Sequence, residues 1–264
     1  MASGTLECNV LRPDFPESWL QPDWPAPPHV RAVMTDRHGG VSAAPYDSLN
    51  LGDHVGDQAA SVLANRAILA EAVGRRPVFL QQIHGVDCVT LNAATPDGVA
   101  ADACMSTTAD VACTIMVADC LPVLFHAPGQ KRVAAAHAGW RGLAGGVLEN
   151  TLQALLGQGS VQDVQAWLGP CIGPTAFEVG EEVREAFVAA DPHAQAAFKP
   201  LATPGKYLAD LPALAHQRLH GAGVTQVEGN DGSLSWCTFS QAQTFYSHRR
   251  DGVSGRFAAS ICLI

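Results

Sequence analysis

Three side chains with soft metal-binding atoms are the most informative feature of this 264-residue chain: His84, Cys120 and His137. Each stands where a strand-like apolar run meets a turn, and open-sheet proteins build their sites at strand ends. Two imidazoles and one thiolate suit zinc, and three protein ligands leave a fourth tetrahedral position open for water or substrate. Their spacing matches no zinc-finger pattern, so the prediction of a catalytic metal centre depends on their placement.

Two features beside these ligands could also do chemistry. Asp119 directly precedes Cys120, and its carboxylate could move protons, orient a ligand histidine, or only cap the following turn. The glycine-rich stretch Gly139–Gly146 contains Arg141. Backbone N–H groups at a helix start and a guanidinium together favour phosphate or another anion. The alternative is a tight strand-to-helix turn that needs small residues, and the absence of the P-loop pattern gives ATP hydrolysis no support.

Two further polar segments are candidates for ligand contacts. Asn50 and His54 lie in a glycine-punctuated loop and could contact a ligand, although turns and helix capping explain the same residues. Arg249 and Arg250 form a basic pair that by itself indicates a solvated hairpin end. A small anionic ligand would respond to local arginines, so the neighbourhoods of Arg141 and Arg249 are where we expect it.

Composition describes a folded domain and excludes several partners. The chain is 47% hydrophobic and 16% charged, which predicts a globular protein with a substantial apolar core. A formal charge of -9 argues against nucleic acid or an anionic membrane as the main partner. The cysteines are scattered without C-x-x-C pairs and the N-terminus lacks a signal-peptide pattern, so we expect a cytoplasmic protein. No stretch is long and apolar enough for a membrane span.

The apolar patterns predict strands and helices in irregular alternation with hairpins, which favours a mixed-sheet α/β or α+β fold. Residues 1–18 are expected to form a loose extension before a single domain of residues 19–264. Strands are predicted at Val30–Met34, Val78–Ile83, Cys88–Leu91, Thr114–Ala118, Val123–His126, Arg132–His137, Val164–Leu168, Val224–Val227 and Arg256–Leu263. The second and third of these are expected to form a hairpin, as are the fifth and sixth. Helices are predicted from the cap Asp57 to Gly74, from the glycine-rich stretch to Gly157, at Glu181–Ala190 and, capped by Asp210, at Leu211–Leu219.

Taken together, the segments resemble the YfiH-like family, whose members are labelled polyphenol oxidases, laccase-domain proteins or purine nucleoside phosphorylases. The resemblance covers about Trp24 to the C-terminus. The stretches that carry it are Thr35–Ser42, Ser48–Asp57, Gln82–Gly85, Ala118–Leu124, His137–Gly142, Leu168–Pro170, Ile172–Pro174, Phe177–Gly180, Cys237–Thr238, Ser247–Gly252 and Gly255–Arg256.

The resemblance implies a four-layer α/β/β/α sandwich and a metal held by the residues at His84, Cys120 and His137. The expected ion is Zn²⁺, with Cu²⁺ as an ion that the site can take up in vitro. The implied reaction is phosphorolysis of adenosine, inosine, guanosine and methylthioadenosine, with some deamination of adenosine. The partners would be purine nucleosides and phosphate, and the oligomeric state stays open. The candidates for catalysis are Cys120 and Asp119, and those for binding substrate or phosphate are Arg141, Asn50 and Arg249.

Three other functions compete with this one. Copper-dependent oxidation of phenols is disfavoured, because one set of two histidines and a cysteine cannot hold a trinuclear copper cluster. A cysteine hydrolase would use Cys120 as nucleophile and His137 as base, and the resemblance suggests peptidoglycan precursors as its substrates. A non-catalytic metal-binding or partner-binding module is the third alternative, which the open fourth ligand position disfavours.

Overall fold

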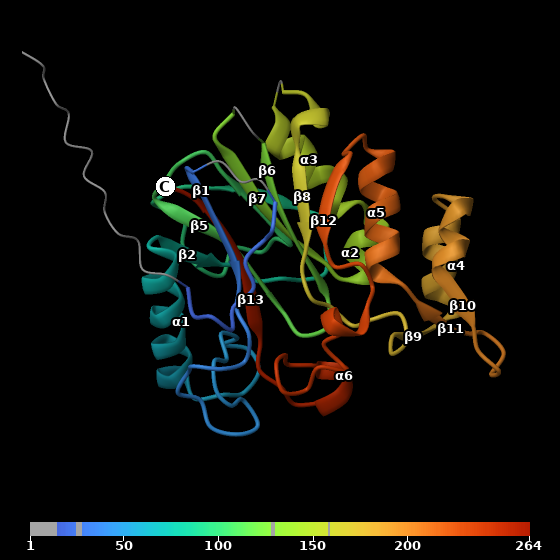
Figure 1. Cartoon of the computed structure of the whole chain (residues 1–264), viewed down its shortest axis with the longest axis horizontal. Coiled ribbons are helices and arrows are strands. Elements are labelled where there is room, and N and C mark those ends of the chain that lie inside the picture. The colour runs from blue at the N-terminus through green and yellow to red at the C-terminus, as the bar shows by residue number, and fades with distance from the viewer. Residues whose placement is uncertain (1–14, 25–27, 128–129, 158) are drawn as a thin grey trace, which may run out of the picture.

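The computed structural model describes residues 15–24, 28–127, 130–157 and 159–264. Two β-sheets stack face to face at its centre (Figure 1). The first sheet contains, in spatial order, β1 (Val30–Met34), β13 (Phe257–Leu263), β5 (Val111–Val117) and β2 (Arg76–Phe79). The second contains β12 (Gln226–Gly229), β8 (Gln165–Leu168), β6 (Leu121–Ala127), β7 (Arg132–Ala138), β4 (Ala103–Ser106) and β3 (Cys88–Leu91). Both sheets are mixed, since β2–β5, β12–β8 and β3–β4 pair in parallel and the other pairs are antiparallel.

Helices cover the outer face of each sheet (Figure 1). The first sheet is covered by α1 (Ala59–Val73). The second is covered by α2 (Trp140–Gly145), α3 (Val147–Leu156) and α5 (Leu211–Gly221). A small antiparallel sheet of β10 (Phe198–Pro200), β11 (Lys206–Ala209) and β9 (Glu178–Gly180) lies beyond α5 together with α4 (Glu181–Val188). The remaining helical elements are α6 (His248–Asp251) and the 3-10 turns Val161–Asp163, Pro192–Ala197 and Leu234–Trp236.

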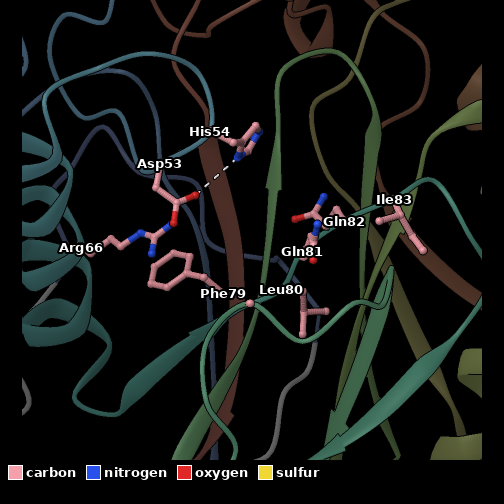
Figure 2. Close-up of a pocket in the computed structure, with 9 residues that line it drawn as sticks. Asp53, His54, Arg66, Phe79, Leu80, Gln81, Gln82 and Ile83 are labelled. Atoms are coloured by element: carbon pink, nitrogen blue, oxygen red, sulfur yellow. Dashed lines mark ion pairs between the residues drawn. The ribbon is translucent and has the colours of Figure 1, made fainter.

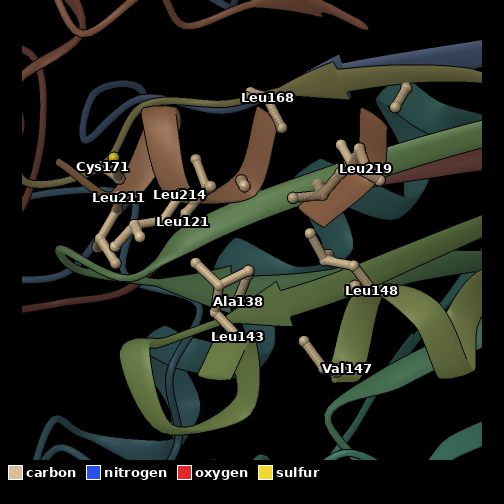
Figure 3. Close-up of a cluster of buried hydrophobic side chains, with 14 of the residues drawn as sticks. Leu121, Ala138, Leu143, Val147, Leu148, Leu168, Cys171, Leu211, Leu214 and Leu219 are labelled. Atoms are coloured by element: carbon tan, nitrogen blue, oxygen red, sulfur yellow. The ribbon is translucent and has the colours of Figure 1, made fainter. Parts of the chain in front are cut away.

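Three hydrophobic clusters hold these layers together. One joins α1 to the first sheet, a second fills the space between the sheets, and the third joins the second sheet to its helices (Figure 3). Side chains alternate accordingly: Val33 faces α1 while Met34 faces the second sheet, and Leu124 faces the first sheet while Phe125 faces the helices. Central strands buried on both faces appear as continuous apolar runs in the sequence. The expected four-layer α/β/β/α sandwich is confirmed.

One expected hairpin is confirmed and the other is wrong. β6 and β7 pair antiparallel, with Leu121 opposite Ala138. The strand predicted at Val78–Ile83 instead ends at Phe79 and pairs with β5 in the first sheet. Its expected partner, β3, pairs with β4 in the second sheet. The chain therefore crosses from one sheet to the other where the sequence suggested a tight turn within a sheet.

Helix boundaries differ from prediction at α1 and in the glycine-rich stretch, and by two residues at the C-terminal ends of α4 and α5. α1 begins at Ala59 with Gln58 as its N-cap, whereas the carboxylate of Asp57 accepts hydrogen bonds from Ser42 and Asn50. The glycine-rich stretch forms two helices, α2 and α3, because Gly146 adopts a left-handed φ of 101° between them. The predicted cap at Asp210 is confirmed.

Most of the expected N-terminal extension lies outside the described residues, so its looseness stays a prediction. Trp19, the first residue of the expected domain, is 4% exposed, and Leu20 forms a bridge with Met34. No helix in the described part of the chain combines the length and apolar character needed to cross a bilayer.

Burial between the two sheets gives a test of the layered core. Leu124 is fully buried there, so Leu124→Ala should lower the free energy of unfolding by about 2–5 kcal/mol in urea titrations. Leu63 on α1 is 67% exposed, and Leu63→Ala should change that free energy by less than about 0.5 kcal/mol. Equal losses in the two variants would contradict the layer assignment.

Candidate metal centre

The three predicted ligands lie together. One ligand atom from each of His84, Cys120 and His137 falls within 4.8 Å of the others. Sγ of Cys120 is 3.7 Å from Nε2 of His84, and the two imidazoles meet edge to face with their centroids 4.8 Å apart. A zinc ion lies about 2.0–2.3 Å from nitrogen and sulfur ligands, so the 3.7 Å between Cys120 and His84 fits two ligands of one ion, whereas atoms 4.8 Å apart must move closer together to share it.

Two of the ligands lie where the chain crosses between the sheets. His84 follows β2, and Cys120 ends the short turn between β5 and β6. His84 has φ 60° and Asp119 has φ 93°, a left-handed conformation in which histidine and aspartate are enriched among non-glycine residues. The turn after β7 passes close beside both ligands at Gly139, where an added Cβ would lie 2.8 Å from His84 and 3.1 Å from Cys120.

A buried carboxylate orients two of the ligands. Asp102 is 0% exposed and precedes β4. Its oxygens accept hydrogen bonds from the backbone N–H groups of Ile83, His84 and Gly85 at 3.1, 2.9 and 2.6 Å. Its Oδ1 also lies 2.8 Å from Nδ1 of His137. If Nδ1 of His137 donates this bond, Nε2 is left as the metal-binding nitrogen, which is how carboxylates commonly orient ligand histidines.

These charges shift each other's protonation. Burial would raise the pKa of Asp102, but the hydrogen bonds from His137 and the 83–85 backbone hold it below its usual value. Burial likewise opposes ionisation of Cys120, yet His137 and His84 lower its pKa to about 6. Burial would lower the pKa of His137, while the thiolate of Cys120 and the carboxylate of Asp102 raise it to about 9. Cys120 is therefore a thiolate at neutral pH, the form that binds metal ions, and metal binding would release the proton from His137.

Two cavities meet at this cluster. The smaller, of about 170 Å³, is lined by His84, Ala118, Asp119, Cys120, Trp140, Arg141, Ile172, Phe177, His248 and Arg249. The larger, of about 340 Å³, is lined by His54, Gln82, His84, Met116, Val117, Ala118, Cys120, His137, His248 and Arg256. The residues common to both are His84, Ala118, Cys120 and His248. His84 and Cys120 thus form part of the wall that both cavities share, and His137 lines the larger cavity alone.

Asp119 connects the turn of Cys120 to α6. Its Oδ1 accepts a hydrogen bond from Oγ1 of Thr238 at 2.6 Å, and its Oδ2 accepts one from the backbone N–H of Arg249 at 2.7 Å. The side chain is 9% exposed and faces the smaller cavity. Both oxygens are thus engaged by residues distant in sequence, so this carboxylate joins its own turn to Thr238 and to α6 rather than capping the turn that follows it.

The two candidate arginines both line the smaller cavity. The guanidinium of Arg141 stacks over the ring of Trp140 at 4.3 Å. That of Arg249 lies 5.4 Å from the ring centroid of Phe177 and donates to the carbonyl of Glu178 at 2.9 Å. Two positive groups therefore face one small cavity beside the metal ligands.

Asn50, by contrast, lines neither cavity. It is 0% exposed, and its amide nitrogen donates to the carbonyl of Gly52 and to Asp57. Its Oδ1 accepts from the backbone N–H groups of Gly52 and Arg256, at 2.9 and 2.8 Å. Asn50 therefore holds its own loop against the start of β13. It acts on the larger cavity only indirectly, through its hydrogen bond with the backbone of Arg256, which lines that cavity.

A third cavity, of about 370 Å³, shares His54 and Gln82 with the larger one. Figure 2 shows His54 and Asp53 paired on one side of it, at 3.5 Å, with Ile83 on the other. Asp53 also pairs with Arg66 at 3.1 Å.

Sequence reasoning missed three residues of this site: Asp102, His248 and Arg256. Arg256 belongs to a stretch that carries the family resemblance, which was the available signal, whereas His248 departs from the tyrosine that is common at its position in such a stretch. Asp102 lies in none of these stretches and stands in the unremarkable setting Ala101-Asp102-Ala103.

Known proteins resemble the chain over nearly its whole length. Residues 31–264 match the family model described as multi-copper polyphenol oxidoreductase laccase. A protein of Pseudomonas aeruginosa named purine nucleoside phosphorylase is 54% identical over 247 residues, covering 93% of this chain and 98% of the relative. Purine nucleoside phosphorylase YfiH of Escherichia coli is 49% identical over 247 residues, which again cover 93% of this chain and 98% of the relative.

Solved structures agree with this likeness. A Neisseria meningitidis protein of the family DUF152 has a TM-score of 0.85 and 48% identity, and covers 94% of this chain and 99% of its own. The Bacillus licheniformis hypothetical protein YfiH has a TM-score of 0.83 and 30% identity, with coverages of 89% and 93%.

The orienting role of Asp102 predicts a loss of metal affinity. Asp102→Asn should weaken zinc binding about 10–100-fold, measured by competition with a chromogenic chelator, because His137 and the 83–85 segment lose the charge that positions them. Asp110→Asn, which changes an exposed carboxylate near the start of β5, should leave the affinity unchanged. Unchanged zinc affinity in Asp102→Asn would refute the role.

Proposed function

The chain belongs to the YfiH-like family of laccase-domain proteins, and from this premise we propose that it is a zinc-dependent purine nucleoside phosphorylase. The proposal rests on the position of His84 and Cys120 in the wall between two cavities, one of which is lined by two guanidinium groups. Full-length relatives named purine nucleoside phosphorylase support it.

Phosphate is assigned to the smaller cavity. Guanidinium groups bind phosphate through paired charge-assisted hydrogen bonds, and Arg141 and Arg249 offer two of them. The stacking of Arg141 on Trp140 limits the orientations of its guanidinium. A phosphate held there would face the shared wall, where it is positioned to attack the anomeric carbon of a ribose.

The nucleoside is assigned to the larger cavity. Its volume of about 340 Å³ is within the usual range for small-molecule sites, and its wall combines apolar Met116 and Val117 with polar His54 and Arg256. With the anomeric carbon at the shared wall, the bond between ribose and base would lie between the two cavities. Adenosine, inosine, guanosine and methylthioadenosine are the proposed substrates.

The donor set fits the proposed ion. His84 and Cys120 present Nε2 and a thiolate, and the contact between Asp102 and Nδ1 of His137 leaves Nε2 of that ring for the metal. When bound, zinc would supply Lewis-acid polarisation, the chemistry that deamination of adenosine as a side activity would need. Asp102 keeps the ligand side chains oriented throughout.

Multicopper oxidation is not proposed despite the description of the family model. That chemistry requires several copper ions held by many histidines. In the described part of the chain, His84, Cys120 and His137 are the one group of three or more histidine, cysteine and acidic residues close enough together to hold a metal ion.

Phosphate dependence tests the proposal. Cleavage of inosine should yield hypoxanthine and ribose 1-phosphate, and removing phosphate should lower the rate at least about tenfold, because water cannot use the guanidinium groups as phosphate does. Chromatography of the products with and without phosphate measures this. Equal rates in phosphate-free buffer, or ribose as the only sugar product, would refute phosphorolysis.

The phosphate assignment predicts which kinetic constant changes when an arginine is lost. Arg141→Gln should raise KM for phosphate about tenfold or more while affecting KM for inosine much less, since a charge-assisted hydrogen bond contributes about 1.5–3 kcal/mol. Arg75→Gln, in the turn after α1 and outside both cavities, is the matched control and should change neither constant. A larger effect of Arg141→Gln on KM for inosine would contradict the assignment.

One observation favours a second candidate, the cysteine hydrolase. Cys120, His137 and Asp102 form a chain of nucleophile, base and orienting carboxylate, with the thiol pKa lowered to about 6 and Asp102 2.8 Å from His137. The same geometry serves metal binding, so loss of activity in a Cys120 variant cannot separate the two functions.

Accessibility of the thiolate separates them. If zinc occupies the site, iodoacetamide should label Cys120 slowly in the metal-loaded protein and quickly after chelation, and nucleoside cleavage should follow metal content. Mass spectrometry of the peptide that contains Cys120 measures the labelling. Rapid labelling of fully metallated, active protein, with turnover unchanged by chelation, would favour the hydrolase.

A further inference from the structure

We propose that His248 is the general acid that protonates the departing purine, a role that rests on the proposed phosphorolysis. Three observations support it. His248 lies in the wall shared by the two cavities, hydrogen bonds hold α6 in place there, and the other polar groups near the cavities are less suited to donate a proton.

Phosphorolysis requires a proton on the base side of the reaction. As an oxygen of hydrogen phosphate forms a bond with the anomeric carbon, the bond from that carbon to N9 breaks and its electron pair moves into the purine. A proton delivered to N7 neutralises the leaving base. The proton carried by the phosphate is then released from ribose 1-phosphate and returns to the acid, so the cycle balances without a further reactant. An acid for this step must lie within hydrogen-bond reach of the base.

The shared wall restricts the candidates. Of its four residues, His84 and Cys120 are metal ligands and Ala118 has no polar side chain. His248 is the remaining one. Its imidazole is exposed, and no described residue makes a hydrogen bond or ion pair with the ring. A histidine placed in this way can donate a proton to a ligand and receive one back.

The backbone under His248 is fixed from both sides. The hydroxyl of Ser247 accepts a hydrogen bond from the N–H of Arg250 at 3.2 Å and caps α6. Asp119 accepts from the N–H of Arg249 at 2.7 Å. The guanidinium of Arg250 donates to the carbonyl of Thr238 at 2.6 Å. These contacts hold α6 against the turn of Cys120 and leave the His248 side chain free to act.

The other proton donors near the cavities are less suitable. Asp119 uses both oxygens to accept hydrogen bonds from protein groups. His54 lines the larger cavity but lies outside the shared wall, where the bond to N9 would break, and it pairs with Asp53 at 3.5 Å. The guanidinium of Arg256 can donate hydrogen bonds but cannot give up its proton under ordinary conditions.

A nucleoside whose base leaves without being protonated distinguishes a general acid from a residue with a merely structural role. His248→Gln should lower kcat for inosine about a hundredfold or more, the usual contribution of a general acid, and change kcat for 7-methylguanosine less than about twofold. The methyl group already places a positive charge on N7 of that substrate. Zinc content and KM for phosphate should be unchanged. His193→Gln alters an exposed histidine of the Pro192–Ala197 turn and should leave both substrates unaffected.

Equal loss on both nucleosides, or loss of zinc in His248→Gln, would overturn the role. If 7-methylguanosine is a poor substrate of the unaltered chain, ribosides of increasingly acidic purines replace it. The effect of His248→Gln should then shrink as the base becomes a better leaving group, and a constant effect would overturn the role. Full activity of His248→Gln on inosine would overturn the acid role and leave phosphorolysis standing, whereas absence of nucleoside cleavage in the unaltered chain would overturn both.

Discussion

The buried carboxylate of Asp102 is the group on which the geometry of the candidate metal centre depends. An ionised carboxylate removed from water is costly unless it is fully hydrogen-bonded, and Asp102 receives three backbone N–H groups in addition to its contact with His137. The backbone groups belong to the segment that leaves the first sheet, and His137 belongs to β7 of the second. Satisfying one charge therefore fixes the position of one imidazole and the orientation of another.

The site lies where the chain passes between the sheets. The connection from β2 to β3 carries His84, and the turn from β5 to β6 carries Cys120. Segments that join stacked sheets at one end must leave both hydrogen-bonded ladders, so their side chains are free to face the space between layers. The rigid sheets on either side then hold these irregular segments, which is how loops on a stable scaffold come to carry function.

Features that depend on residues close together in the sequence could be predicted, and features that depend on distant pairings could not. The ligand trio, the β6–β7 hairpin and the cap of α5 depend on residue type and near neighbours, and the structure places them as expected. The crossing after β2 was missed because a short polar segment between two strands is equally compatible with a hairpin. Only the sheet pairings distinguish a crossing from a hairpin. The left-handed backbone at residue 84 could not be recognised from the sequence either, because the residue there is histidine and not glycine.

Buried polar residues were the hardest to interpret. Asn50 is polar and lies in a loop rich in glycine, which suggests a ligand contact. The structure instead uses all of its hydrogen-bonding capacity within the protein. Asp102 was missed for the opposite reason, since an aspartate between alanines carries no local pattern. Three of the four side-chain hydrogen bonds of Asn50 stay within its own loop, as the turn interpretation expects, and only the one from Arg256, 206 residues away, links it to another element. The partners of Asp102 lie 17 to 35 residues away, so no local motif could identify it.

Asp119 gives the two cavities a common mechanical element. Its backbone adjoins the ligand Cys120, while its carboxylate holds the N–H of Arg249 and the hydroxyl of Thr238. Arg249 faces the smaller cavity and His248, one residue earlier, faces both. A displacement of α6 would therefore move the guanidinium of Arg249 and the imidazole of His248 together. Both would move relative to the candidate ligand Cys120, which directly follows Asp119. Because a single carboxylate fixes all three, groups on either side of the shared wall keep a constant separation, as the proposed attack of phosphate on a nucleoside across that wall requires.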